Sequence, residues 1–457
     1  MTGDLPPGWA RTALGSICRI EYGKSLSKRQ RVEAGSVGVY GSAGLVGHHD
    51  QALVDEPVVI VGRKGNAGAV WYTEEPSWPI DTTYFLRVPS GICAKYLGMQ
   101  LEHLDLVEYD SSTTIPSLRR PDLEATSVCF SPPAEQVRIV AAIEEHFSRL
   151  DTATAAITAA QARIEASRRS ILAEAFSGRI VLQDPNDEPA AALLERIAAD
   201  RQPARRPSPP TASTADPSRV TSDLPPSWVW ATVAEVARVQ LGRQRSPQQH
   251  TGEHMRPYLR AANVTWQGIN LDDVKEMNFD HPDFAKYRLE SGDILLNEAS
   301  GSPHEVGKPA IWNNEIKDCC FQNTLLRLRP QRVNGTYLHW YCYAQASTGR
   351  FGEAGRGVNI RHLGKRGLAQ FPIPVAPSAE QERIVAAIKE HFSRLDTATA
   401  AITAAQARIE ASRRSILAEA FSGRLVPQDP NDEPATTLLE RIAVSRRTAP
   451  ARQEASA

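Results

Sequence analysis

A heptad pattern of apolar positions occurs twice in this chain. The stretch from Ala134 to Ala198 is repeated from Ala379 to Ala443, and the two copies differ at six of 65 positions. In both copies, isoleucine or leucine recurs at every seventh residue, which is the spacing of a helix–helix seam. A single stripe of this kind would also fit an amphipathic helix in a globular core, but two nearly identical stripes predict two long helices that pack on each other. The seam positions are Ile143, Leu150, Ile157, Ile164 and Ile171, and then Ile388, Leu395, Ile402, Ile409 and Ile416.

Local signals indicate where these helices begin and end. Two prolines precede the first helix, and Ser378 with Gln381 three residues later predicts a capping box at the start of the second. Gly178 and Gly423 fit the left-handed residue that ends a helix. Each rod should be roughly 65 Å long at a rise of ~1.5 Å per residue. The predicted spans are residues 132–178 and 377–423.

The heptads alone do not fix the direction of pairing. A parallel pair would put the segments that precede the helices at one end, and an antiparallel pair would put them at opposite ends.

The two segments that precede the helices follow one plan. They open alike, with Leu-Pro-Pro-Gly-Trp from Leu5 and Leu-Pro-Pro-Ser-Trp from Leu224. Each then has a short apolar strand with a polar glycine-bearing loop, an acid or amide followed by another strand, and a turn-rich basic segment before the long helix. These features lie at Val58–Gly62, Arg63–Gly68, Asp81–Arg87 and Ser112–Asp122, and then at Asp293–Leu296, Asn297–Ser302, Gln322–Arg327 and Gly355–Gly367.

Composition shifts define the remaining boundaries. Each long helix is followed by a strand-like Arg-Ile-Val or Arg-Leu-Val and by a short helix ending in Leu-Leu-Glu-Arg-Ile-Ala. A segment rich in Pro, Ser, Thr, Ala and Arg then reads as a solvated linker, and the last residues read as a disordered tail. The predicted divisions are 1–131 (first unit), 132–178 (long helix), 179–198 (strand plus short helix), 199–222 (linker), 223–376 (second unit), 377–423 (long helix), 424–444 (strand plus short helix) and 445–457 (disordered tail).

Length and composition allow two or three domains with real cores. No apolar run approaches the ~20 residues of a membrane span, and no secretory signal is recognisable, so we expect a cytoplasmic protein. The six cysteines have no C-x-x-C spacing, which indicates reduced, buried thiols and no metal site. The formal net charge is −1, with 12 basic and 15 acidic residues in 1–131 and 18 and 15 in 223–376. Any DNA-binding surface must therefore be local.

We find no motif typical of a catalytic site. Gly23-Lys24-Ser25 lacks the first glycine of a phosphate loop, because Cys18 occupies that position. The H-E-x-x-H zinc helix, the G-x-S-x-G elbow and the aromatic-ended Asn-Pro-Pro or Asp-Pro-Pro loop of amino-methyltransferases are all missing from the sequence. The sequence predicts a non-catalytic chain.

The polar loops carry side chains suited to reading DNA. A base edge is read by a guanidinium fork on guanine or an amide on adenine. The segment from Arg350 to Arg366 holds four Arg, one Lys and one His against Glu353 alone, although an ordinary solvated loop can have the same composition. Trp71, Tyr72 and Trp266 could stack on bases, but aromatics beside strands more often belong to a core. The candidates are Arg63, Lys64, Asn66, Arg119 and Arg120 in the first unit and Arg243, Arg245, Asn263, Asn297, Asn323, Arg356, Asn359, Arg361, His362, Lys365 and Arg366 in the second.

The whole chain resembles the specificity (S) subunits of Type I restriction-modification systems. The resemblance rests on the two Leu-Pro-Pro openings, the loop Arg63–Gly68, the Ala-Glu-Gln step into each long helix and the repeated Gln-Asp-Pro-Asn-Asp-Glu-Pro segment. The paired segments Ile115–Leu123 and Ile360–Leu368 also carry it.

This resemblance implies an α+β chain with two target recognition domains of mixed α/β fold, separated by a pair of conserved helices that form an antiparallel coiled coil. Each domain would read one half of a split double-stranded DNA sequence. Two modification (M) subunits would dock on the helices, and restriction (R) subunits would join them. No cofactor is expected in this chain; S-adenosylmethionine, ATP and Mg are expected in the partners.

Two other classes of protein remain possible from the sequence. One is a coiled-coil scaffold that presents two adaptor domains and does not bind DNA. The other is a self-contained nuclease or methyltransferase with unfamiliar motifs. Salt-sensitive DNA binding separates the scaffold from the specificity subunit, and unaided activity would identify an enzyme.

Overall fold

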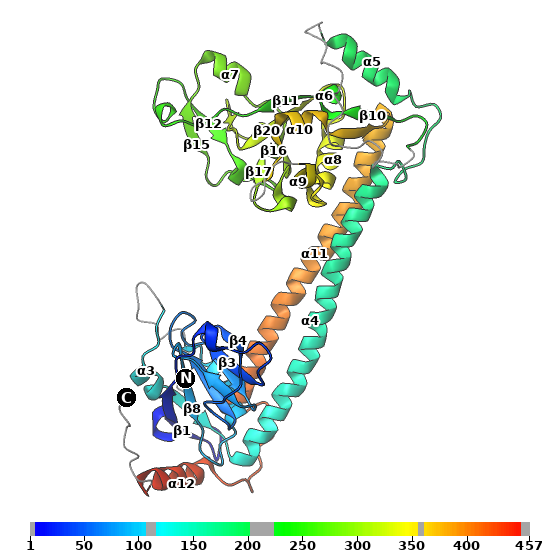
Figure 1. Ribbon diagram of the computed structural model, residues 1–457. Coiled ribbons are helices and arrows are strands. Elements are labelled where there is room, and N and C mark those ends of the chain that lie inside the picture. Colours follow the sequence, from blue (N-terminus) through cyan, green and yellow to red (C-terminus); the bar gives the residue numbers. More distant parts are fainter. Residues whose placement is uncertain (1–4, 107–115, 202–223, 355–360, 449–457) are drawn as a thin grey trace. The chain divides into compact units, whose positions relative to one another are not determined.

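The computed structural model describes residues 5–106, 116–201, 224–354 and 361–448. The chain forms two compact units: residues 1–159 with 402–457, and residues 160–401. The long helices α4 (Pro133–Ala175) and α11 (Ser378–Phe421) each contribute to both units (Figure 1). Each unit is therefore assembled from both copies of the repeat.

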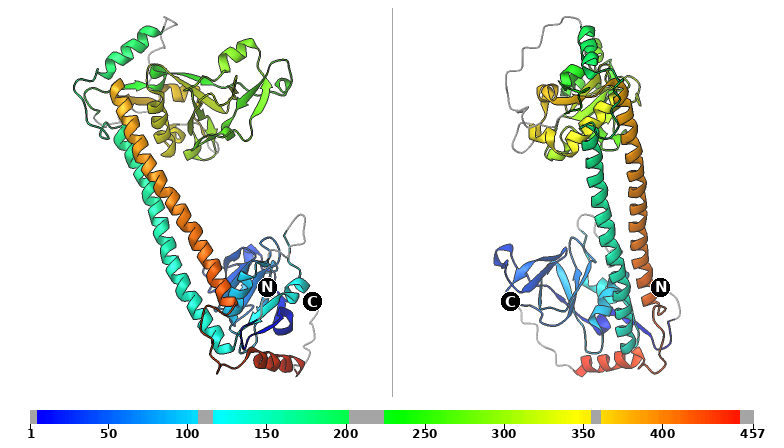
Figure 2. Two further views of the ribbon diagram at one scale, coloured as in Figure 1. Left: turned by 180° about the vertical axis from the view of Figure 1, so that it is seen from behind. Right: turned by 90° about the vertical axis from the view of Figure 1, so that its right-hand side faces the viewer.

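The two long helices are antiparallel in each unit. In the first unit, Arg138 of α4 pairs with Asp432 just beyond α11, and Asp151 further along α4 pairs with Arg413 of α11. In the second unit, Arg168 of α4 lies 2.6 Å from Asp396 of α11. The Arg168–Asp396 and Arg413–Asp151 pairs join the same positions of the two repeats. Figure 2 shows α4 beside α11 in both views. The antiparallel coiled coil of the expected fold class is confirmed, and parallel pairing is excluded.

The heptad positions form the seam as predicted. Ile143 and Ile388 are fully buried, and the other eight seam residues are half-buried. Gly178 and Gly423, both at φ +73°, have the left-handed conformation that the sequence predicted for the helix ends.

The predicted capping box at Ser378 is wrong. The Gln381 amide instead donates to Ala376 O at 2.8 Å and accepts from Asn334 N at 2.9 Å. In the first unit, Gln136 makes the same two bonds with Ser131 O and Cys93 N, both at 2.9 Å. Each glutamine therefore links the start of its long helix to the neighbouring α/β body. It does so by pairing with backbone groups that would otherwise be buried without partners.

The first unit contains an α/β body of small sheets. Strand β5 is buried along its whole length because it lies inside a four-stranded antiparallel sheet, as its unbroken run of valine and isoleucine predicts. The elements are β1 (Ala10–Ala13), α1 (Leu14–Ile17), β2 (Arg19–Tyr22), β3 (Val37–Gly41), β4 (Gly44–His49), β5 (Val58–Gly62), β6 (Val70–Thr73), β7 (Ser77–Pro79), β8 (Thr83–Arg87), α2 (Ala94–His103), α3 (Arg120–Ala125) and β9 (Ser127–Phe130), with α12 (Ala435–Thr448) from the chain's far end.

The second unit repeats this plan with additions. Its elements are α5 (Ala190–Asp200), β10 (Val229–Thr232), α6 (Val233–Val236), β11 (Ala237–Leu241), β12 (Met255–Leu259), β13 (Val264–Thr265), β14 (Gly268–Ile269), β15 (Lys275–Asn278), α7 (His281–Tyr287), β16 (Ile294–Asn297), β17 (Ala299–Ser300), β18 (Pro309–Ile311), β19 (Cys320–Phe321), β20 (Leu325–Pro330), α8 (Gly335–Ser347), α9 (Arg350–Ala354), β21 (Arg361–His362), α10 (Gly364–Gln370) and β22 (Pro372–Val375).

The sheets of the two units have one topology. The order β2-β8-β5-β6 in the first unit corresponds to β11-β20-β16-β18 in the second. The three-stranded sheets β4-β3-β7 and β15-β12-β19 each join an antiparallel pair to a parallel one, and the pairs β1-β9 and β10-β22 also correspond. The common plan predicted for the two diverged segments is thus a common sheet topology.

Each α/β body is completed by the tail of the other repeat. In the first unit, the buried carboxylate of Glu135 accepts from Trp9 Nε1 at 3.1 Å and from Gln428 Nε2 at 2.6 Å. In the second unit, Glu380 accepts from Trp228 at 2.9 Å and from Gln183 at 2.6 Å. Burial raises the pKa of both carboxyl groups, and these hydrogen bonds partly oppose the shift. The repeated tryptophans and Gln-Asp-Pro segments therefore close the two units.

Two predicted boundaries need correction. No strand forms in residues 179–182 or 424–427, where the chain bends. Ile180, Val181, Leu425 and Val426 pack on the cores, and no strand among the described residues pairs with the backbone there. Helix α5 extends into the predicted linker, and α12 takes up the first four residues of the predicted tail. Residues 202–222 of the linker and 449–457 of the tail lie outside the described residues.

Candidate nucleic-acid interface

In each unit, the loop after a central strand lies beside the segment that precedes the long helix. In the first unit, Lys64 bridges Ser117, and Leu118 N donates to Arg63 O at 3.0 Å. In the second unit, strand β17 pairs with β21, and Leu363 N donates to Glu298 O at 2.9 Å. Two polar stretches that are far apart in the sequence thus form one edge in each unit.

Tyr22 is the centre of this edge in the first unit. The ring is 51% exposed, and it lies 5.4 Å from the Arg63 guanidinium and 6.0 Å from that of Arg120. Arg63 also donates to Asp81 O at 2.8 and 3.1 Å, which fixes the direction of its fork. The ring thereby holds two guanidiniums together at the surface.

The Tyr84 ring packs against the Tyr22 ring. The two ring centroids are 5.1 Å apart, and the Tyr84 hydroxyl donates to Leu118 O at 3.1 Å. Burial, with a further contribution from Tyr22, raises the pKa of Tyr84 to about 12, so the phenol keeps the proton it donates. Sequence analysis missed Tyr22; its one signal is a tyrosine directly before the Gly23-Lys24 turn.

The other first-unit candidates are also at the surface. Lys64 and Asn66 are exposed in the loop after β5. Arg119 is exposed and pairs with Asp122 at 2.7 Å, an ion pair that solvent screens. All five predicted residues of this unit therefore lie in the loop after β5 or at the start of α3.

In the second unit, six candidates are at least partly accessible. Arg245 is exposed and donates to His250 at 3.0 Å. His362 lies 3.0 Å from the Glu298 carboxylate, and half-buried Arg361 donates to Gly352 O at 2.9 Å. The remaining accessible candidates are half-buried Asn323 and exposed Lys365 and Arg366.

Three predicted residues have structural roles instead. The Asn263 side chain is 2% exposed and bonds Arg260 N, Asn270 O and Asp273 O. Asn297 is also buried, at the end of β16. The Arg243 guanidinium pairs with Asp283 at 2.6 Å and lies over a phenylalanine ring. In this conformation Asn263 and Asn297 are buried and Arg243 is engaged in an ion pair, so we leave these three out of the proposed DNA contacts.

Two candidates, Arg356 and Asn359, lie outside the described residues. The three aromatic candidates are in or beside cores. Trp71 and Tyr72 pack on the first-unit clusters, and Trp266 packs against Tyr343 with its indole donating to Glu305 at 3.0 Å.

A close approach of backbones explains the glycine of the Gly23-Lys24 turn. A Cβ on Gly23 would lie 2.0 Å from Ile80 O, and one on Gly242 would lie 2.1 Å from Gln322 O. Only glycine fits these crossings, which position the end of β2 and of β11 beside the loops described above.

The cysteines in the described residues are all free thiols. Burial raises the pKa of Cys18 to about 12, so it is protonated and unreactive at neutral pH. The described part of the chain has no cluster of His, Cys, Asp or Glu that could hold a metal ion. It also contains no helix that is both long and apolar enough to span a membrane.

Comparisons with known proteins agree with this architecture. Residues 6–164 match the family described as the Type I restriction modification DNA specificity domain. The specificity subunit of Type I restriction enzyme EcoDI from Escherichia coli is 22% identical, over 97% of this chain and 96% of that protein. The EcoAI specificity subunit, also from Escherichia coli, is 27% identical over 61% of this chain and 55% of that protein.

The fold has a solved counterpart. A chain described under complex assembly and conformational transition of the type I R-M system superposes with a TM-score of 0.65, at 18% identity, over 92% of this chain and all of that one. The matching family model is that of a DNA specificity domain, and the two relatives named above are specificity subunits. Residues 6–164 thus match a Type I DNA specificity domain, and nearly the whole chain is similar to specificity subunits of Type I restriction enzymes.

Proposed function

We propose that this chain reads a bipartite double-stranded DNA sequence, with one half-site for each unit. One observation carries the proposal: both units bring the loop after a central strand to the start of the helix α3 or α10, in one topology. The side chains at these two edges differ. Arg63 and Arg120 have Glu298 and Lys365 as their counterparts, so the same scaffold would read different bases.

The proposed contacts are the accessible members of the predicted set. Guanidiniums, an amide and an imidazole offer donors or acceptors for base edges, and lysines suit phosphates. These residues are Arg63, Lys64, Asn66, Arg119, Arg120, Arg245, Asn323, Arg361, His362, Lys365 and Arg366, together with Arg356 and Asn359 outside the described residues.

We further propose that the paired helices set the gap between half-sites and carry the docking surfaces for two M subunits, which R subunits join. The helices differ at few positions and are exposed beside the seam, so they offer two nearly identical surfaces to two copies of one partner. S-adenosylmethionine, ATP and Mg would be bound by those partners.

An insertion of seven residues into α4 alone tests this role of the helices. One heptad preserves the face of the seam but lengthens one rod by roughly 10 Å. We expect the methylated sequence to change its gap or to disappear, with both half-site sequences unaltered where methylation persists. Methylome sequencing of cells that carry the variant provides the readout. An unchanged gap would refute the proposal that the paired helices set the distance between the half-sites.

DNA binding by the full chain with M subunits tests the proposal as a whole. We expect binding that weakens as salt rises, because phosphate contacts release counterions. If the complex binds no DNA at any salt concentration, the alternative class of a coiled-coil scaffold would be favoured.

A further inference from the structure

A basic cavity lies beside the recognition edge of the second unit. It has a volume of about 700 Å³ and is lined by residues of α5, α6, β11 and α10. Figure 1 labels these four elements. Three cations line it: Arg201 at the end of α5, Arg238 on β11 and Lys365 on α10. The cavity adjoins the edge formed by β17 and β21, because Lys365 follows His362 of β21 by three residues.

Two of these cations have no ion partner among the described residues. Arg238 and Lys365 are exposed and unpaired there. Arg201 is held in place, since it donates to Glu235 O at 3.0 Å and to the Gln331 side chain at 2.9 Å. Asp200, the acid in the lining, is already paired with Arg332. The cavity therefore has a surplus of positive charge.

The guanidiniums of Arg201 and Arg238 are close enough to repel each other. Burial lowers the pKa of Arg201; Glu235 opposes this shift and Arg238 adds to it. An anion between the two would relieve the repulsion.

In the first unit, the cations that correspond to Arg238 and Lys365 have acidic partners. Arg19, the counterpart of Arg238, lies 3.3 Å from Glu21, and Arg120, the counterpart of Lys365, lies 2.7 Å from Glu124. Glu124 also packs against Gly15, where a Cβ would lie 2.8 Å from it. The second unit has Ala369 in place of this glutamate. Two of the three cations are thus ion-paired in the first unit, whereas their counterparts in the second unit have no ion partner among the described residues.

We propose that the cavity formed by Arg201, Arg238 and Lys365 binds the phosphodiester backbone of the DNA that flanks the second half-site. This inference rests on the proposed function and adds a sequence-independent anchor to it. Phosphate contacts position a protein on DNA and do not read bases. The second unit would then bind with a steeper salt dependence than the first.

Two substitutions test the anchor. Arg238→Gln removes one cation, and Ala369→Glu introduces the carboxylate that the first unit carries. The full chain, with its M subunits, is titrated with duplex DNA containing the methylated sequence at a series of salt concentrations. We expect each variant to reduce the slope of log K against log[salt] by roughly 0.9 for each lost phosphate contact, with the methylated sequence unchanged.

Arg19→Gln in the first unit is the matched control, and we expect it to leave the slope unaltered. A slope that stays at the wild-type value in Arg238→Gln overturns the anchor, as does a variant that weakens only the association with M subunits. An altered second half-site would also overturn it, because the cavity would then read bases. Salt-dependent binding of the wild-type chain to the same duplex tests the proposed function separately, so the two can fail independently.

Discussion

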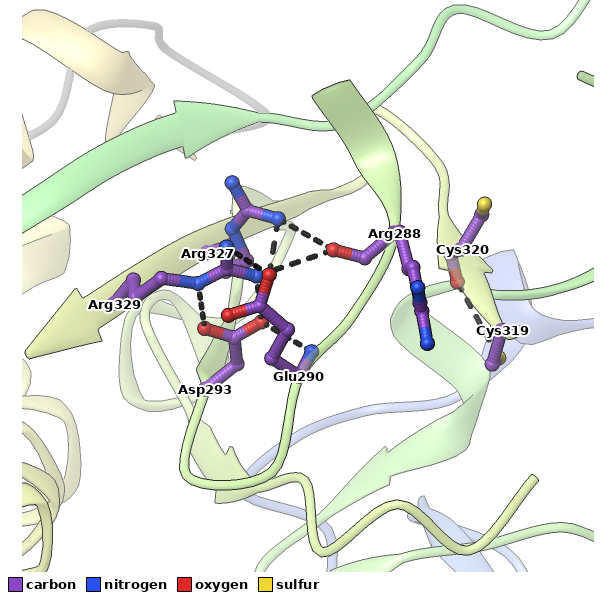
Figure 3. A network of polar contacts seen from close by, with 7 residues as sticks. All are labelled: Arg288, Glu290, Asp293, Cys319, Cys320, Arg327 and Arg329. Atoms are coloured by element: carbon purple, nitrogen blue, oxygen red, sulfur yellow. Dashed lines mark hydrogen bonds and ion pairs between the residues drawn. The ribbon is translucent and has the colours of Figure 1, made fainter. Parts of the chain in front are cut away.

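The corresponding four-stranded sheets of the two units differ at one interior position, which is ionic in one unit and apolar in the other. In the second unit, Asp293 is 1% exposed, and its carboxylate accepts from Arg329 at 2.7 and 2.8 Å. Arg327, also buried, lies 4.0 Å from Asp293, and both arginines donate to Arg288 O. Glu290 completes this ion cluster, as Figure 3 shows.

The first unit has an apolar cluster at this position. Strand register aligns Ile60 with Phe85 in one sheet and Leu295 with Arg327 in the other, so Phe85 is the counterpart of Arg327 and Val58 that of Asp293. Both first-unit residues are in a small cluster with Val54 and Ile60. The same interior position of the sheet is therefore filled by apolar packing in one unit and by a cluster of ion pairs in the other.

Removal of one partner from the ion cluster should have the largest effect. Asp293→Val leaves two arginines without their shared carboxylate, one of them buried. We expect a loss of about 3–5 kcal/mol in the stability of the second unit, which is the range for breaking a buried pair. Hydrogen exchange of β16 and β20 measures it, with β5 and β8 of the first unit as the internal reference.

The double variant Asp293→Val with Arg327→Phe copies the first unit. It should recover most of that stability, because an apolar pair of similar size replaces the ion pair. A double variant as unstable as the single one would show that the two sites are not interchangeable.

Replacing the glycine that ends each long helix should destabilise the two units equally. The loss of stability should be smaller than that from Asp293→Val. A Cβ on Gly178 would lie 2.3 Å from Pro225 Cγ, and one on Gly423 would lie 2.4 Å from Pro6 Cγ, both at positive φ. Gly178→Ala and Gly423→Ala should each destabilise their own unit by about 1–3 kcal/mol from strain alone, and by more because of the clash.

Gly292→Ala separates strain from clash. Gly292 also has positive φ, but the space around its missing Cβ is open. Thermal unfolding that ranks Gly292→Ala as the most damaging of the three variants would contradict the close packing of the prolines on the helix ends.

The smallest effect is expected from a substitution of the exposed Tyr22. Tyr22→Leu installs the residue that ends the corresponding strand β11 in the second unit and removes the ring that two guanidiniums contact. Each exposed cation–π contact is worth about 0.5–1 kcal/mol, so we expect roughly 5- to 30-fold weaker DNA binding, with loss of discrimination in one half-site only. Tyr22→Phe keeps the ring and should bind normally. Equal loss of discrimination in both half-sites would contradict the assignment of Tyr22.

The sequence predicted the periodic features of this fold and missed most of the tertiary ones. The seams and the stopping glycines follow local rules, and the structure has both. Burial of Asn263 and Asn297 could not be predicted, because it depends on how the surrounding turns and strands pack over them. The strand expected after each helix failed because a strand needs a neighbour, and none lies beside it. Closure of each unit by the other repeat is likewise a long-range event, to which the repeated tryptophans were the one clue.

Within the candidate site, chemistry was predictable and exposure was not. The basic loops were recognisable from composition, but Arg243 and Arg63 look alike in sequence although one is locked in an interior ion pair and the other faces solvent. Tyr22 was missed because an aromatic at the end of a strand is usually core.

The most direct test is to replace the second unit, residues 224–376, by the corresponding segment of a relative that methylates a different sequence, and to map the methylome. The account predicts a hybrid sequence with one half changed, the other half retained and the gap unaltered. A change in both halves, or in neither, would contradict the claim that each unit reads its own half of the target.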